Sequence, residues 1–451
     1  ASDSASQSAS SSFSPIPVTG VVGTNVENGP LGLPTTSSRT DVGFPKTVKP
    51  AFSEQKHVGR PVVLDPENFM RRVQGVVDRC WLTNNGPEVQ EFEQRVAAHL
   101  GVRHCIATCN GTVALSLTAQ CLQLQGEIIV PSFTFIATPH AFASIGLTPR
   151  FADVDPETGC IDVESVRSLI GPQTTAIAGV HLWGHTCDVE QLQQLACEHN
   201  LKLLFDASHA FGTTRNGVYV GGFGEAETFS FHATKYINAA EGGAVTTNSD
   251  ELAARLRAAR NFGFTGVDQV EHLGINAKMN ELSAAMGNAS LDTYTRRLTI
   301  NEQNFRSYQQ HLEGIAGLEM VKFPQAEVNN YQYVVVRINS AGFGGDRDQL
   351  LATLVQHNIL ARRYFYPGCH RAEPYASAKH FPLPNTESLS NQVLSLPTGP
   401  DICEEDVAKI CKVIRISQQI SASENLQSAP APFSSKVPRN QTQHHSPSIE
   451  D

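Results

Sequence analysis

The sequence lacks close cysteine pairs, a basic start and any long apolar run free of polar residues. Its ten cysteines form no CxxC unit, the spacing typical of zinc ribbons and dithiol redox sites, so we predict no structural metal. The start has neither the basic nor the apolar region of a secretory signal, which makes the cytoplasm the expected location. The uncharged stretch 132–149 has the length of a membrane span, but serine, threonine, proline and glycine interrupt it, so we expect no membrane association.

The sequence also has fewer basic than acidic residues: 34 lysines and arginines against 44 aspartates and glutamates give a net charge of -10. Nucleic acids and anionic membranes are themselves negative, so a general affinity for either is not expected. The 451 residues suffice for two packed domains of ordinary size with additional ends.

Large apolar residues are scarce at both ends of the chain. Residues 1–55 are dominated by serine, proline, glycine, threonine and asparagine, and residues 419–451 have a similar polar composition. Such segments bury too little apolar surface to offset the entropy lost on ordering. We therefore expect a disordered N-terminal arm and a disordered C-terminal tail.

Between these ends, short apolar runs alternate with amphipathic segments. HCIATC, EIIVPS, PRFADVD, TTAIAGVHLW and LKLLFDAS are typical of strands, and helical patterns separate most of them. This alternation predicts an α/β domain over 56–297, with a mostly parallel central sheet flanked by helices. Over 298–418 the pattern changes to helix, an exposed-face strand at YQYVVVRI, then helix and loop, which predicts a smaller C-terminal α+β domain.

The segment TFSFHATKYINAAEGG ends a predicted strand and contains one lysine, Lys235. Its neighbours Phe231 and Ile237 are apolar, which predicts a buried lysine. Burial disfavours the charged ammonium by several kcal/mol, on the order of one or more pKa units, and so lowers the pKa of the amine. A desolvated lysine has a depressed pKa and forms imines readily. Taken alone, the segment fits an ion-paired loop lysine equally well.

A second polar group follows another strand, where LLFDASHAFG places Asp206 at the strand end. A carboxylate there needs a cationic partner, and a protonated pyridine nitrogen is one such partner. The alternative is that Asp206 caps the following turn. A third element is Asn110, Gly111 and Thr112, which lie between a strand and a helix, where free N–H groups favour an anion such as phosphate. Phe133 or Phe135, near the end of a third strand, would cover one face of a flat cofactor.

These segments together resemble the DegT/DnrJ/EryC1/StrS family of sugar aminotransferases, which have the aspartate-aminotransferase-like fold type I of pyridoxal-phosphate enzymes. The resemblance spans about residues 61–416. Its pieces, in chain order, are LTNNGPEVQEFE, CNGTVAL, VPSFTFIATPHA, FADVDPETG, VHLWGH, LLFDASHAFG, SFHATKYINAAEGGAV, RNFGF, INAKMNELSAAMG and RRYFYPGCH.

The resemblance implies that Lys235 forms a Schiff base with pyridoxal 5'-phosphate and shuttles the proton during catalysis. It further implies that Asp206 holds the pyridine nitrogen and that His209 lies near the phenolic oxygen. The remaining implied roles are phosphate binding by Gly111, Thr112 and Ser230, ring stacking by Phe135, binding of the neighbouring subunit's phosphate by Asn276, and an approach to substrate by His370.

The resemblance also bears on the reaction. Related sugar dehydratases carry histidine at the Schiff-base position, so Lys235 favours transamination. RNFGFTG, GINAKMNE and LARRYFYPGCHRAEPY look most similar to the branch that aminates C4 of nucleotide-linked 4-keto-6-deoxyhexoses, with glutamate as donor and a dTDP-4-amino-4,6-dideoxyhexose as product. Amination at C3, an inosose or aminoshikimate-type substrate, and a catalytically silent cofactor-binding regulator are the alternatives.

The expected assembly is a homodimer with shared active sites. Met279, Leu282, Ser283 and Met286 recur at helical spacing directly after Asn276. Such a face packs inside its own domain as readily as it packs against a partner. In the resembling family the equivalent segment crosses a two-fold interface, and we expect the same here.

Overall fold

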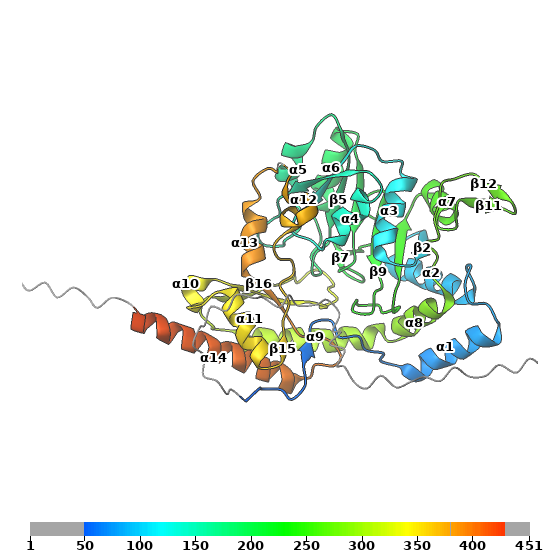
Figure 1. Cartoon of the computed structure of the whole chain (residues 1–451). Helices are drawn as coiled ribbons and strands as arrows, with labels where there is room; N and C mark the ends of the chain where they lie inside the picture. Colours follow the sequence, from blue (N-terminus) through cyan, green and yellow to red (C-terminus); the bar gives the residue numbers. More distant parts are fainter. Residues whose placement is uncertain (1–48, 379, 429–451) are drawn as a thin grey trace, which may run out of the picture. The chain divides into compact units, whose positions relative to one another are not determined.

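The computed structural model describes residues 49–378 and 380–428, with side chains to residue 421. Its central feature is a seven-stranded sheet (Figure 1). In spatial order the strands are β2 (His104–Thr108), β10 (Gly243–Thr247), β9 (Ala226–Ser230), β6 (Lys202–Asp206), β5 (Thr174–Val180), β3 (Glu127–Pro131) and β4 (Thr148–Ala152). β10 is antiparallel to both neighbours, and the other pairs are parallel. The predicted α/β class with a mostly parallel sheet is confirmed.

Helices accompany this sheet; some connect its strands, and the first of them packs against the last. They are α1 (Pro66–Asp78), α2 (Pro87–Leu100), α3 (Gly111–Cys121), α4 (Ala137–Ala143), α5 (Val163–Leu169), α6 (Val189–Glu198), α7 (Asp250–Ala259) and α8 (Glu281–Asp292). Several begin at a side chain that accepts a free backbone N–H. Asn110, Asp162 and Asp188 each bind the N–H three residues ahead. Each such cap stabilises its helix by about 1 kcal/mol.

The C-terminal part has its own three-stranded antiparallel sheet, in the order β13 (Leu318–Met320), β14 (Val334–Ile338), β16 (Val393–Leu396). Three longer helices pack with this sheet: α9 (Tyr294–Leu312), α11 (Arg347–Gln356) and α14 (Glu404–Ser428). The expected division at 297/298 falls inside α9 and stays a prediction. Shorter elements complete this part: α10 (Ser340–Phe343), η1 (Cys369–Arg371), α12 (Glu373–Ala376), α13 (Pro384–Gln392) and β15 (Ile359–Leu360).

The prediction of an exposed-face strand at YQYVVVRI is wrong. β14 is the middle strand of its sheet, and Val334 and Val336 are buried in the core formed with α9, α11 and α14. Val335, on the opposite face, is buried in the core that extends from the large sheet. A run of consecutive valines is typical of a strand covered on both faces, which is what the structure contains.

The described structure extends into both ends for which disorder was predicted. Phe52 is buried in the C-terminal core, and β1 (Lys56–His57) pairs with β15, so residues 49–55 are not part of a disordered arm. At the other end α14 continues to Ser428, because no proline or glycine interrupts the chain between Glu404 and Ser428. Residues 1–48 and 429–451 lie outside the described residues. Among the described helices, none combines the length and the apolar composition that crossing a membrane requires.

Candidate active site

The polar groups singled out in the sequence follow neighbouring strands of the large sheet. Asp206 is the last residue of β6, Ser230 ends the adjacent β9, and Lys235 lies in the loop after β9. β6 and β9 are parallel, so their carboxyl ends meet at one edge of the sheet, where ligands of open α/β sheets bind. The sheet therefore brings Asp206, Ser230 and the Lys235 loop to a common edge.

The Asp206 carboxylate is buried and held in place from two sides. Its Oδ2 accepts a hydrogen bond from the Thr138 hydroxyl at 2.8 Å, and its Oδ1 accepts one from the Ser208 N–H at 3.0 Å. The Ser208 contact is the turn cap that the sequence left open as an alternative. Because the Thr138 bond reaches from α4, Asp206 does more than cap its own turn: its orientation is fixed by a second element.

The amine of Lys235 has a lowered pKa, as a nucleophilic lysine requires. Burial lowers the pKa of its amine to about 8, and the nearby Asp206 carboxylate opposes this shift only in part. Burial also lowers the pKa of His209 well below its usual value, and the Lys235 charge adds to that effect. Lys235, Asp206 and His209 thus lie within electrostatic reach of one another, with the imidazole held neutral.

Aromatic rings form one wall of this group. The His209 ring is stacked on Phe365, with centroids 5.9 Å apart at 16°, and lies 4.4 Å from the Tyr333 ring. The centroid of the Phe135 ring lies 6.1 Å from that of Phe365. Phe133 is fully buried against Trp183, whereas Phe135 is 48% exposed. Of the two candidate phenylalanines, only Phe135 offers an open ring face to a ligand.

The N-terminus of α3 faces the end of β9. The Val113 and Ala114 N–H groups bind Asn110, but the N–H groups of Gly111 and Thr112 have no hydrogen bond to any described residue. A Cβ built on Gly111 would lie 3.0 Å from the Ser230 Cβ, so glycine permits this close approach. Two free N–H groups and the half-buried Ser230 hydroxyl therefore lie together, as an anion site requires.

Asn276 is not part of this group. It is exposed, and its backbone bridges Asn261 near the end of α7. The following residue, Ala277, accepts from the Cys109 N–H, which ties the segment to the end of β2. The role predicted for Asn276 is in a partner's site, and its exposure leaves the side chain available for that role.

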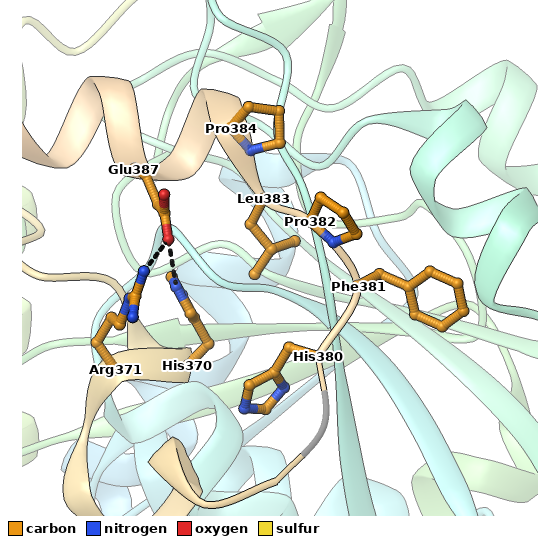
Figure 2. Close-up of a pocket in the computed structure, with 8 residues that line it drawn as sticks. All are labelled: His370, Arg371, His380, Phe381, Pro382, Leu383, Pro384 and Glu387. Carbon is orange, nitrogen blue, oxygen red and sulfur yellow. Dashed lines mark hydrogen bonds and ion pairs between the residues drawn. The ribbon is translucent and has the colours of Figure 1, made fainter.

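His370 also lies outside the described contacts of Lys235. Its Nδ1 is 2.7 Å from the Ser132 Oγ, and its Nε2 is 3.5 Å from Glu387. Arg371 pairs with the same carboxylate (Figure 2). His370, Arg371 and Glu387 border a cavity of about 350 Å³. Its remaining lining residues are His380, Phe381, Pro382, Leu383 and Pro384. Through its contact with Ser132, His370 fixes the segment that leads from β3 to Phe135. Its contact with substrate stays a prediction.

Sequence reasoning missed Thr138, Tyr333 and Phe365. Thr138 lies one helical turn beyond Phe135, in the segment already singled out, and a hydroxyl in a mostly apolar helix was the available signal. Tyr333 and Phe365 come from the C-terminal part, more than 120 residues from His209 in the sequence. No local pattern relates residues at such a separation.

Known proteins are similar to this chain over most of their length. Residues 64–415 match the DegT/DnrJ/EryC1/StrS aminotransferase family. The dTDP-4-amino-4,6-dideoxy-D-glucose transaminase of Shigella dysenteriae is 34% identical over 371 residues, which cover 81% of this chain and 99% of that protein. The GDP-perosamine synthase of Vibrio cholerae is 32% identical over 355 residues, covering 77% and 95% respectively.

A solved structure is similar as well. The crystal structure of DesI in the presence of its TDP-sugar product superposes with a TM-score of 0.81 at 45% identity. The match covers 84% of this chain and 97% of that one.

Proposed function

Because the chain belongs to the DegT/DnrJ/EryC1/StrS aminotransferase family, whose members are pyridoxal-phosphate-dependent sugar aminotransferases, we propose that it aminates C4 of a dTDP-linked 4-keto-6-deoxyhexose. Glutamate is the proposed amino donor, and the product is a dTDP-4-amino-4,6-dideoxyhexose. Two curated relatives named as transaminases of such a dTDP sugar, and the similarity to a structure holding a TDP-sugar product, support this choice of substrate.

The residues at the sheet edge fit pyridoxal phosphate. The free N–H groups of Gly111 and Thr112, with the Ser230 hydroxyl, suit a phosphate at the start of α3. Asp206 is oriented by Thr138 and suits a protonated pyridine nitrogen, and Phe135 offers an exposed ring to one face of the heterocycle. The family accounts for the cofactor, and these assignments of individual residues are our proposal.

When bound, the cofactor supplies an electron sink for the bond that breaks at the amino-bearing carbon. Lys235 would hold the cofactor through its amine, and its free Nζ would carry the proton between the substrate and cofactor carbons. Asp206 keeps the proton on the pyridine nitrogen. His209, which is neutral and stacked on Phe365, would pack beside the pyridine ring and exclude water from that side of the cofactor.

The observation that carries the proposal is the position of Asp206 and the Lys235 loop at the common carboxyl edge of β6 and β9, where burial lowers the pKa of Lys235 to about 8 within electrostatic reach of Asp206. A solvated lysine at neutral pH is almost wholly protonated and is a poor nucleophile. A lysine of lowered pKa beside a fixed carboxylate is therefore the arrangement that imine chemistry needs.

Incubation of the purified protein with pyridoxal phosphate, glutamate and dTDP-4-keto-6-deoxyglucose tests the proposal. We expect an amino sugar of the corresponding mass, with the new amine assigned to C4 by NMR, and no product from Lys235→Ala. Product from 3-keto sugars or keto-inositols alone would reject the C4 assignment. A visible cofactor band that glutamate leaves unchanged would instead indicate a silent cofactor-binding homologue.

We further propose that the active unit is a homodimer. The hairpin of β11 (Phe264–Gly266) and β12 (Gln269–Val270) extends beyond α7 and leads to Asn276 (Figure 1). Val267 at its tip is 91% exposed, and Leu273 beyond it is 88% exposed. Exposed apolar side chains concentrated on one hairpin are typical of a surface that a partner covers. A second copy related by a two-fold axis would cover both hairpins equivalently.

A further inference from the structure

The segment after β1 runs beside the segment after β15. The two strands are parallel, with Lys56 opposite Ile359 and His57 opposite Leu360. Both strands end at the same side of the pair: a turn at Val58 and Gly59 leads from β1 to Arg60, and Arg362 lies two residues beyond β15, bridged to Ser395. Two arginines distant in sequence are thereby placed at one end of the β1–β15 pair.

This end of the pair lies against the loop of the proposed catalytic lysine. Gly59 has a left-handed backbone, with φ of 68°, and a Cβ built on it would lie 3.2 Å from the Cβ of Thr234. Thr234 directly precedes Lys235, and its carbonyl accepts a hydrogen bond from the Gln332 side chain at 3.0 Å. Arg60 therefore follows a residue in contact with the Lys235 loop.

Arg362 approaches the same site through aromatic residues. Its charge lowers the pKa of Tyr364, although burial of that phenol has the larger, opposite effect. Tyr364 stacks on Phe365, with ring centroids 5.1 Å apart, and Phe365 also stacks with the ring of His209. The guanidinium of Arg362 thus lies near the aromatic wall of the candidate active site.

Neither the exposed Arg60 side chain nor the half-buried Arg362 side chain has a hydrogen bond or ion pair among the described residues. The charge of Arg60 nevertheless reaches Asp401: burial raises the pKa of that carboxyl, and Arg60 lowers it in part. Burial, then Arg362 and Arg60, lower the pKa of His57, which shows that the three groups are close together. Lys56 is already paired with Asp406 at 2.7 Å.

One acidic group, Asp401, faces this cluster. It raises the pKa of His57 slightly against the two arginines, and both of its carboxylate oxygens are shielded from solvent without a hydrogen-bond partner in the described part of the chain. One carboxylate cannot neutralise two guanidinium groups. The cluster therefore keeps an excess of positive charge in a protein whose net charge is -10.

We propose that Arg60 and Arg362 bind the diphosphate of the nucleotide-linked sugar. This rests on the proposed function, since it assigns part of the same substrate. Guanidinium groups bind phosphate oxygens with two parallel hydrogen bonds and remain charged when partly buried. Anchoring the diphosphate beside Gly59 and Thr234 places the sugar next to Lys235, and the contact makes no use of the base.

The test uses the holoenzyme and the variants Arg60→Gln, Arg362→Gln and Arg306→Gln. Arg306 is the matched control, because it is an exposed arginine on α9 that pairs with Glu302. We measure the Kd for dTDP, and the KM values for dTDP-4-keto-6-deoxyglucose and for glutamate. In Arg60→Gln and Arg362→Gln we expect the Kd for dTDP and the KM for the sugar to rise about tenfold or more, the usual effect of losing a charge-assisted hydrogen bond. The KM for glutamate and the weak binding of thymidine should be nearly unchanged.

Several results would overturn the assignment. Unaltered dTDP affinity in both arginine variants would do so, as would equal weakening in Arg306→Gln or the absence of nucleoside diphosphate binding to the unaltered protein. Failure of the proposed function is distinguishable: the unaltered protein would then make no amino sugar at C4. If it still bound dTDP, UDP or GDP and lost this affinity in the arginine variants, the diphosphate site would stand.

Discussion

The Thr138 hydroxyl donates a 2.8 Å hydrogen bond to Asp206 Oδ2 and thereby links α4 to the end of β6. Thr138 is fully buried, and its Oγ1 lies 3.3 Å from the Thr134 hydroxyl. β3, which leads into α4, is separated from β6 by β5. The carboxylate is therefore oriented across the sheet edge by a helix that belongs to a different strand.

Replacing Thr138 by valine keeps the side-chain shape and removes this hydrogen bond. A hydrogen bond to a charged group contributes about 1.5–3 kcal/mol, so we expect cofactor affinity and turnover to fall about tenfold or more. Equilibrium dialysis with pyridoxal phosphate and steady-state kinetics measure the two effects. Thr138→Ser is the control, because it retains the hydroxyl; similar losses in both variants would show that packing, and not the hydrogen bond, matters.

The ionisation of Lys235 predicts a pH dependence. Burial lowers the pKa to about 8, so half of the amines are neutral and nucleophilic near that pH, and the fraction falls as the pH decreases. For the apo-enzyme we expect covalent attachment of pyridoxal phosphate, trapped by borohydride and mapped by peptide mass, to increase through pH 8 and then level off. An ordinary lysine would continue to gain reactivity to about pH 10.4.

A second variant tests the sign of the Asp206 contribution. The carboxylate raises the pKa of Lys235, so Asp206→Asn should move the midpoint of this profile to lower pH. A midpoint that moves to higher pH, or one that lies near pH 10 in the unaltered protein, would contradict the electrostatic coupling described above.

The predictable part of this molecule is the part encoded by local pattern. Buried parallel strands such as EIIVP and KLLFD stand out because each is a short apolar run that ends in a polar or helix-starting segment. Parallel topology then places Asp206 and the Lys235 loop at one edge without further information. The family resemblance supplied the cofactor and the roles of individual residues.

What escaped prediction depends on contacts distant in sequence. The pattern of YQYVVVRI predicts an exposed-face strand, and only its position between β13 and β16 explains why both faces are buried. Phe52 lies in a polar segment, yet its ring packs with the C-terminal core near His357 and Ile359. Composition averages over a window and therefore hides a single anchoring side chain.

That anchoring predicts unequal effects of neighbouring substitutions near the N-terminus. Phe52→Ala should lower the free energy of unfolding by about 3–5 kcal/mol, the usual cost of truncating a buried phenylalanine. Ser53→Ala, at an exposed neighbouring position, should change it by less than about 0.5 kcal/mol. Urea denaturation measures both. Equal stability of the two variants would mean that Phe52 contributes nothing to the core.

His370 should affect stability more than substrate affinity. It is buried, and His370→Ala removes the 2.7 Å contact between its ring and the Ser132 hydroxyl, which then keeps only the hydrogen bond from the His370 N–H; we expect a cost of about 1–3 kcal/mol. Glu387→Gln weakens only ion pairs of a solvent-exposed carboxylate, which water screens, and should cost clearly less stability. Chemical denaturation and the KM for the keto sugar separate the roles. A large rise in KM at unchanged stability would favour direct substrate binding.

The proposed sharing of active sites between two subunits predicts how Asn276 acts. Its exposed side chain lies beyond the apolar hairpin, and we expect it to bind the phosphate of the cofactor held by the partner subunit. Asn276→Asp keeps the shape of the side chain and places a carboxylate against that phosphate. Cofactor retention should therefore fall, because like charges at short range repel. Asn261→Asp, at the other residue of the same bridge, adds a carboxylate beside Lys278, whose Nζ lies 2.8 Å from Asn261 Oδ1, and is the control for an added charge that the chain itself neutralises.

Complementation distinguishes shared from separate sites. In a mixture of Lys235→Ala and Asn276→Asp chains, a heterodimer with shared sites has one site with both defects and one with neither. Random pairing of equal amounts makes half of the dimers heterodimers, so about a quarter of the activity of the unaltered enzyme should return after subunit exchange. If Asn276 served its own chain, each site of the heterodimer would keep one defect and no activity would return. A fully active monomer in sedimentation would exclude shared sites altogether.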